Sequence, residues 1–207
     1  MMLLYVGAEN WPLPIPLVQK HSVWYFDTNI GRGEILARRV GGNELAAINA
    51  CNQLVDAQQQ HYAKANNGEH RYALTLVGND NGPDGLFSSE NKDQSASPLD
   101  TLIASAGVEN GTTASHDPVP FNGYYFRILT AQGNNAEGGA KSYLVNGKMQ
   151  GGFAFVAYPA AYRSSGVMTF IVNQNGVVYQ KDLGPDTEKI ANAMTAYDPD
   201  STWERTN

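Results

Sequence analysis

Hydrophobic and polar positions alternate most regularly between Gly151 and Asp186. The pattern predicts three β-strands, at Phe153–Tyr158, Val167–Asn173 and Val177–Asp182. Asn175 and Gly176 tolerate the positive φ angles of a tight turn, and we expect them to join the last two strands into a hairpin. Phe170 and Ile171 place apolar side chains on both faces of the middle strand. We therefore expect this strand in the interior of an antiparallel sheet, covered on one face and partly on the other.

Helical spacing of apolar residues predicts two helices earlier in the chain. The first is short, Glu34–Val40, and Gly41 and Gly42 are suited to its left-handed C-terminal cap. Asn43 is the predicted N-cap of a longer helix that runs to about Lys64. Its apolar stripe is Leu45, Ile48, Cys51, Val55 and Tyr62, and Gln53, Asp56, Gln59 and Gln60 are expected to face water. Such a stripe is typical of a packing surface rather than of a cofactor site.

The first 30 residues combine prolines with large aromatic side chains. Pro14–Val18 and Val23–Asp27 are predicted to be extended and joined by a polar tip. Because proline cannot donate to a strand ladder, Trp11–Pro16 is expected at a sheet edge or in a polyproline-like conformation. Trp24 and Phe26 share one face of the second segment, and we expect them to pack on the helices of the same chain. The alternative is an apolar edge that pairs with another molecule.

The other predicted elements are a strand at Arg71–Val77, a helix from Ser97 to Gly107, strands at Tyr124–Thr130 and Ser142–Asn146, and a closing helix near Pro185. The closing helix has one apolar face, formed by Ile190, Ala193, Met194 and Tyr197. This order predicts an α+β fold in which a long N-terminal helix packs on an antiparallel β-sheet, with an N-terminal hairpin and a C-terminal helix. We expect residues 1–30 to be a hairpin segment, the remnant of an upstream region, and residues 31–207 to form the main α+β domain.

Composition excludes several classes of partner. The 207 residues include 14 basic and 20 acidic side chains, which gives a net charge of −6 and makes nucleic acid a poor candidate. No apolar run reaches the roughly 18 residues of a membrane span. Met1–Tyr5 shows neither the basic region nor the apolar length of a signal peptide. Cys51 is the only cysteine, so no disulfide forms within the chain, and we expect its side chain to behave as a small apolar group.

His116 lies next to the carboxylate of Asp117 in the loop that precedes Pro120. As a general base it would need a nearby nucleophile, for which Ser115, Ser164 or Ser165 are the candidates. This pair defines the alternative hypothesis, a hydrolase, but a solvated loop histidine is the simpler interpretation. His21, His61 and His70 lack metal-ligand spacing.

The oxygen-rich loop Asn79–Gly85 departs from the EF-hand pattern. Val77 stands where the first Asp is needed, and Ser88 where the bidentate Glu is needed, so we expect no calcium there. The glycine pairs 138–139 and 151–152 are not followed by the residues of a phosphate-binding loop. We therefore assign no catalytic, cofactor-binding or metal-binding residue.

Seven aromatic residues alternate along the predicted strands: Tyr124, Tyr125, Phe126, Phe153, Phe155, Tyr158 and Tyr162. We expect about half of them in the core. The other half would form an exposed sheet face that binds a carbohydrate, a peptide or a partner chain.

Long runs of the sequence resemble a bacterial family known as domain of unknown function 2950. They include WPLPIPLV, WYFDT, GRGEILARRVGGNELAAI, VDAQQQHYA, GYYFRILTAQG, YLVNGKMQGGFAFVAYPAAY and GVMTFIVNQNGVVYQKDLGPDT. The resemblance covers nearly the whole chain. It implies a secreted or envelope-located protein, periplasmic or extracellular, with no established activity. Such proteins usually carry an export signal and an extra N-terminal region, so we expect this chain to be a C-terminal portion.

The predicted order of elements is also similar to the globular half of type IV pilins and pseudopilins. A long helix ends in an Asn/Gly turn and leads through an irregular connection into an antiparallel sheet. No prepilin cleavage site and no apolar half-helix precede Asn43, and a shared fold does not carry function across. The sequence therefore predicts a non-catalytic secreted or envelope module with a structural or macromolecule-binding role.

Overall fold

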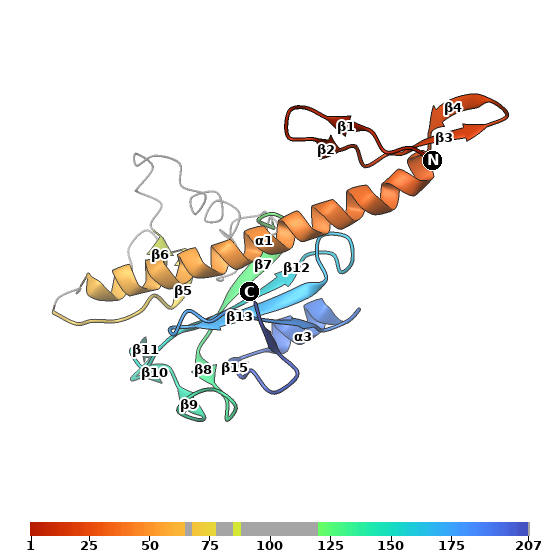
Figure 1. Cartoon of the computed structure of the whole chain (residues 1–207). Coiled ribbons are helices and arrows are strands. Elements are labelled where there is room, and N and C mark those ends of the chain that lie inside the picture. The colour runs from red at the N-terminus through yellow and green to blue at the C-terminus, as the bar shows by residue number, and fades with distance from the viewer. Residues whose placement is uncertain (65–67, 78–84, 88–119, 207) are drawn as a thin grey trace, which may run out of the picture. The chain divides into compact units, whose positions relative to one another are not determined.

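The computed structural model describes residues 1–64, 68–77, 85–87 and 120–206, which are coloured in Figure 1. They belong to two compact units, Met1–Gly42 and Asn43–Asn207. The two units meet in sequence within one long helix, α1 (Thr28–Ala63). The helix predicted from Ser97 to Gly107 lies outside the described residues.

The larger unit is built around a five-stranded antiparallel sheet with the strand order β16-β14-β13-β12-β7. The strands are β7 (Tyr124–Leu129), β12 (Ala154–Pro159), β13 (Met168–Asn173), β14 (Tyr179–Asp182) and β16 (Glu204–Arg205). Val156 on β12 lies opposite Ile171, and Gln180 on β14 lies opposite Phe170. Phe170 is 0% exposed and Ile171, on the opposite face, is 1% exposed. The prediction of an interior middle strand is confirmed, and both of its faces are covered.

The C-terminal half of α1 covers one face of this sheet (Figure 1). Its buried residues are Ala47, Ala50, Cys51, Leu54, Val55 and Gln58, a spacing of three and four that places them on one side of the helix. Glu44 fixes the helix to the start of β13, because its Oε1 accepts hydrogen bonds from the backbone N–H groups of Val167 (2.8 Å) and Met168 (3.0 Å).

The prediction of two separate helices is wrong, because α1 continues through Gly41 and Gly42. Neither glycine has a positive φ angle, and Asn43 donates its side-chain N–H to the carbonyl of Ser165 (2.8 Å) instead of capping a helix. Each glycine costs about 1 kcal/mol relative to alanine, which is less than the cost of ending one helix and nucleating another. The predicted stripe is also partly wrong. Cys51 and Val55 are buried as expected, but Leu45 is 65% exposed.

The other face of the sheet is covered by the short helix α3 (Thr187–Ala193) (Figure 1). Thr187 and Ala191, four residues apart, are its buried positions. Arg127 on β7 donates to the carbonyls of Ala191 (2.6 Å) and Met194 (3.1 Å), so its guanidinium satisfies the C-terminal end of the helix. The apolar face predicted for this helix is wrong. Ile190 is 41% exposed, and the buried residues of α3 are Thr187 and Ala191 instead.

Several short strands extend the larger unit. β8 (Ala131–Gln132) lies between β9 (Lys141–Ser142) and β15 (Ala196–Tyr197), and β10 (Leu144–Val145) pairs with β11 (Lys148–Met149). Tyr197, predicted on the closing helix, is therefore a strand residue. Asn146 (φ 51°) and Gly147 (φ 78°) form the turn between β10 and β11. The turn at Gly176 is wider than predicted, because residues 174–178 connect β13 to β14.

The strand predicted at Arg71–Val77 is reduced to β5 (Thr75–Val77), which pairs in parallel with β6 (Gly85–Phe87). Upstream of it, the backbone of Ala73 pairs with a side chain instead of a strand. The Gln58 amide donates to the Ala73 carbonyl (2.9 Å) and accepts from the Ala73 N–H (2.8 Å). Both residues are fully buried.

The smaller unit contains two β-hairpins and the first part of α1. β1 (Tyr5–Val6) pairs with β2 (Trp11–Pro12), and β3 (Leu17–Lys20) pairs with β4 (Val23–Phe26). His21 and Ser22 both have positive φ angles and form the turn of the second hairpin. The prediction of two extended segments joined by a polar turn is confirmed for Val23–Asp27, but the first strand is Leu17–Lys20 instead of Pro14–Val18. Asp27 then caps α1, because its Oδ1 accepts from the N–H groups of Asn29 and Ile30 (both 3.1 Å).

Candidate interaction surface

Strand β4 exposes four consecutive apolar side chains. Val23 is 64% exposed, Trp24 44%, Tyr25 43% and Phe26 49%. The expectation that Trp24 and Phe26 pack on the helices of the same chain is therefore wrong. A hairpin of two strands has no second layer of its own, so both faces of β4 remain open to solvent.

The outer edge of β4 also presents backbone hydrogen-bonding groups. Asp27 donates its N–H to the Pro16 carbonyl (2.9 Å), so the backbone groups of Asp27 face β3. Because every second residue of an antiparallel strand bonds to the same neighbour, Val23 and Tyr25 also direct their N–H and C=O groups to β3. Trp24 and Phe26 direct theirs outward, where no described residue provides a backbone partner.

The outer edge of β3, in contrast, is paired. Leu17 exchanges two backbone hydrogen bonds with Met2, of 2.7 and 2.9 Å. The second hairpin thus has one closed edge and, within the described residues, one open edge, and the open edge is the one with the aromatic side chains.

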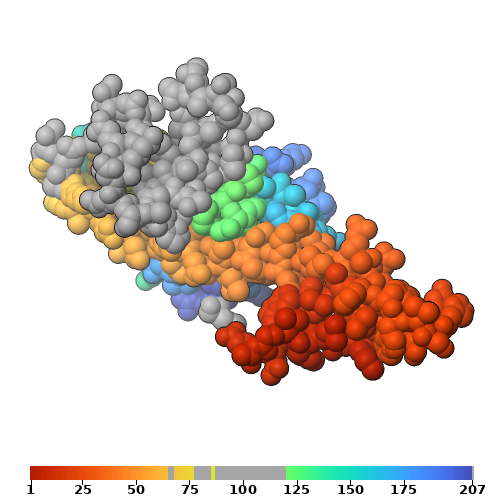
Figure 2. Space-filling view, turned by 90° about the horizontal axis from the view of Figure 1, so that it is seen from above, coloured from red at the N-terminus to blue at the C-terminus, as the bar shows by residue number. Residues whose placement is uncertain are grey.

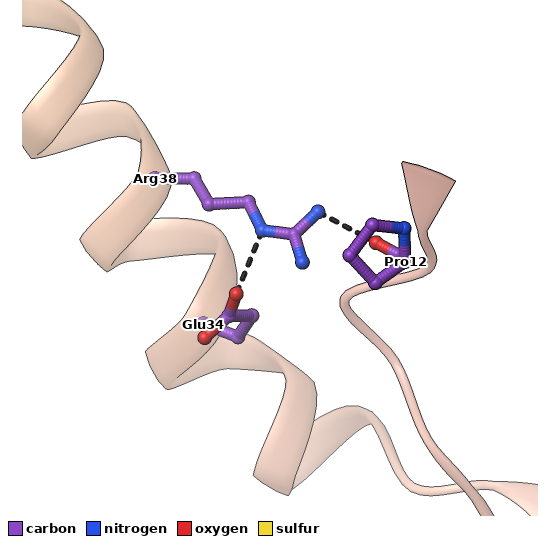
Figure 3. Close-up of polar contacts among 3 residues, drawn as sticks. All are labelled: Pro12, Glu34 and Arg38. Atoms are coloured by element: carbon purple, nitrogen blue, oxygen red, sulfur yellow. Dashed lines mark hydrogen bonds and ion pairs between the residues drawn. The ribbon is translucent and has the colours of Figure 1, made fainter. Parts of the chain in front are cut away.

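Arg38 on α1 holds the first hairpin (Figure 3). Its Nη1 donates to the Pro12 carbonyl (2.7 Å) and its Nε donates to Oε1 of Glu34, one helical turn away (2.7 Å). The guanidinium also lies over the Trp11 ring, 4.7 Å from its centroid. These contacts fix the first hairpin against α1 while Trp11 stays 51% exposed.

The exposed large apolar residues on the strands of the smaller unit are called here the N-terminal apolar surface. They are Tyr5, Val6, Trp11, Val23, Trp24, Tyr25 and Phe26. Figure 2 shows the hairpins that carry them, in red, at the surface of the molecule. The smaller unit has three acidic and four basic residues, whereas the whole chain has 20 acidic and 14 basic ones. The excess negative charge of the chain therefore lies outside the unit that carries this surface.

The aromatic residues predicted to form an exposed sheet face are mostly in the core. Tyr124, Phe126, Phe153, Phe155 and Tyr158 are at most 5% exposed, and Tyr125 and Tyr162 are half-buried. Burial raises the pKa of Tyr124 far above its ordinary value, and its hydroxyl donates to the Met168 carbonyl (2.9 Å). The expected exposed half of this set is thus wrong, because α1 and α3 cover both faces of the sheet.

Most of the residues considered for chemistry lie outside the part of the chain that the structure describes. His116, Asp117 and Ser115 lie outside the described residues, as does nearly all of the Asn79–Gly85 loop, so the hydrolase hypothesis and the expectation of no calcium in this loop stay predictions. In the described part of the chain, no group of three or more His, Cys, Asp or Glu side chains is placed to hold a metal ion. Ser165 Oγ accepts from the backbone N–H of Ala161 (2.9 Å) and donates to its carbonyl (3.2 Å).

The pKa shifts of two other titratable groups follow from their structural surroundings. Burial raises the pKa of the Cys51 thiol to about 12, which disfavours the nucleophilic thiolate and confirms that this residue packs as a small apolar group. A hydrogen bond from Lys148 (2.5 Å) lowers the pKa of the partly exposed Glu69 carboxyl. Among the described helices, none is both long and apolar enough to cross a membrane.

Comparison with known proteins gives a single finding. No curated protein and no solved structure matches the chain, so the predicted likeness to pilin domains is not supported by these comparisons. One family model, described as protein of unknown function (DUF2950), matches residues 1–206. Because that match covers all but the last residue of the sequence, this chain belongs to the DUF2950 family.

Proposed function

We propose that this protein is a non-catalytic module of the cell envelope or the extracellular space that binds a macromolecule through its N-terminal apolar surface. The observation that carries the proposal is strand β4, in which four consecutive apolar residues are 43–64% exposed beside an open backbone edge. Location outside the cytoplasm rests on the resemblance to a family of secreted and envelope proteins.

The free-energy cost of leaving β4 exposed to water supports a binding role for this strand. Water contact with apolar surface is unfavourable by about 25 cal/mol for each Å². Contiguous exposed apolar residues of this kind mark interaction sites in soluble proteins. An open strand edge is a second liability, because it pairs with any extended chain unless charges or prolines block it. Val23–Phe26 contains neither a charge nor a proline. A partner that covers this strand would remove both costs.

Site-specific photo-crosslinking in cells that express the full chain tests the proposal. Trp24 is replaced by the photoreactive amino acid benzoyl-phenylalanine, and the same replacement at Leu45 serves as the control, because Leu45 is a 65% exposed apolar residue of the larger unit. We expect macromolecular adducts from position 24 and few from position 45. Equal yields at the two positions, or none at position 24, would overturn the proposal.

A further inference from the structure

We infer that the partner of β4 is a second copy of this chain, paired antiparallel through the same strand about a two-fold axis at Tyr25. This inference rests on the proposed function and names its partner. Trp24 and Phe26 each present an N–H and a C=O outward on this edge, so one copy offers four groups. An identical strand running in the opposite direction offers the same four groups in complementary order.

The turn and the helix at either end of β4 select one register. With the axis at Tyr25, Trp24 of each copy lies opposite Phe26 of the other, and all eight outward groups form four hydrogen bonds. An axis at Trp24 would place Phe26 opposite Ser22, whose φ of 64° interrupts the strand. An axis at Phe26 would place Trp24 opposite Thr28, which already belongs to α1. The register centred on Tyr25 is therefore the one that leaves no outward group of β4 unpaired.

Charge and exposure are compatible with this arrangement. Val23 of one copy lies opposite Asp27 of the other, and Lys20 is the cross-strand neighbour of Val23 on the same face. Lys20 of each copy thus approaches Asp27 of the other, so the charges that meet are opposite in sign. In the segment from His21 to Ile30 every residue except Asp27 is exposed. The pairing would cover part of this exposed surface on each copy.

Disulfide trapping tests the register. Residues on the two-fold axis form a non-hydrogen-bonded pair whose Cα atoms are about 4.5 Å apart, close enough for a disulfide. Oxidation of Tyr25→Cys by copper phenanthroline and oxygen should therefore convert two thiols into one disulfide and give a covalent dimer. The matched control is Val23→Cys, because the two copies of that residue would be separated by about four residues of strand, roughly 13 Å. The natural Cys51 is buried and should not react.

A proline substitution tests the backbone pairing. The N–H of Trp24 does not bond to β3, so Trp24→Pro removes an outward donor from each copy without breaking the hairpin. Trp24→Ala removes the same ring and keeps the N–H. In sedimentation equilibrium of the full chain we expect a monomer–dimer equilibrium, weakened at least about tenfold further by Trp24→Pro than by Trp24→Ala. Circular dichroism of each variant verifies that the fold is kept.

The outcomes separate this inference from the proposed function. A covalent dimer from Tyr25→Cys but not from Val23→Cys, with the weakening by Trp24→Pro, supports the inference. A chain that stays monomeric up to about 0.5 mM, or equal cross-linking of the two cysteine variants, overturns it. If that chain still forms photo-adducts with another macromolecule at position 24, the proposed function stands and only the identity of the partner is wrong.

Discussion

Replacement of Gln58 should reveal how much one buried amide contributes to the stability of the larger unit. Its side chain forms both hydrogen bonds that a neighbouring strand would otherwise give Ala73, at 2.9 and 2.8 Å. Gln58→Leu keeps the approximate volume but leaves the buried N–H and C=O of Ala73 without partners. Each unsatisfied buried polar group costs about 1–3 kcal/mol, so the loss of partners for two groups should lower the free energy of unfolding by about 2–6 kcal/mol.

Gln58→Glu adds a dependence on pH with a definite sign. The protonated carboxyl can donate to the Ala73 carbonyl and accept from its N–H, whereas the carboxylate brings a charged oxygen against that carbonyl and is also buried. Both effects raise the folded-state pKa of the introduced carboxyl above the value of about 4.3 expected in the unfolded chain. Stability relative to wild type is then greatest below about pH 4 and is lost as pH rises, by at most about 1.4 kcal/mol for each pH unit between the two pKa values.

Urea denaturation followed by circular dichroism at pH 4 and pH 7 measures both effects. Gln59→Leu and Gln59→Glu are the matched controls, because Gln59 is the exposed neighbour on the same helix, and each should change stability by less than about 0.5 kcal/mol. The reasoning would be refuted by a Gln58→Leu variant as stable as wild type, or by a Gln58→Glu variant whose destabilisation is the same at both pH values.

Three further outcomes are expected. Phe170→Ala should lower the unfolding free energy by about 3–5 kcal/mol, because the ring is fully buried in the central strand; a loss under about 1 kcal/mol would contradict that packing. Burial raises the pKa of the Cys51 thiol to about 12, so it should resist a thiol reagent at pH 8 in the native protein and react fully in urea; rapid native labelling would show that it is accessible. Lys148 lowers the pKa of Glu69, so their interaction stabilises the fold above the unfolded pKa and is lost as pH falls through the folded one. Lys148→Met should therefore differ from wild type above about pH 5 and converge with it in acid, as thermal melts would show.

The sequence predicts the central sheet well because the pattern of apolar residues within each strand is a local property. Strand β13 has apolar side chains on both faces, which predicts that both faces are covered, and Phe170 and Ile171 are indeed buried. The same alternation cannot tell which element covers a face. The alternation therefore predicts one buried and one exposed half for the aromatic residues of β7 and β12, although α1 and α3 cover both sides of the sheet.

The predictions that are wrong concern positions where contacts with distant parts of the chain override the local sequence preference. Gly41 and Gly42 have the chemistry of a helix end, but the hydrogen-bond ladder of α1 continues through them. Gln58 stands in a run of glutamines that looks solvated, and only the fold brings it to Ala73. The size and aromatic character of Trp24 predict that it is buried. The residue type alone does not indicate whether another part of the same chain covers it.

The uninterrupted path of α1 through both compact units affects how the protein unfolds. Glycine gains more conformational entropy than any other residue type when a helix melts. The helix α1 is therefore easiest to unfold at Gly41 and Gly42. Two residues further on, Glu44 anchors the helix to the backbone of Val167 and Met168. Fraying that begins at the N-terminus of α1 can therefore pass through the glycines at little cost but is opposed at Glu44. The smaller unit can thus open as a separate cooperative segment of low local stability, while the amides of the sheet remain protected.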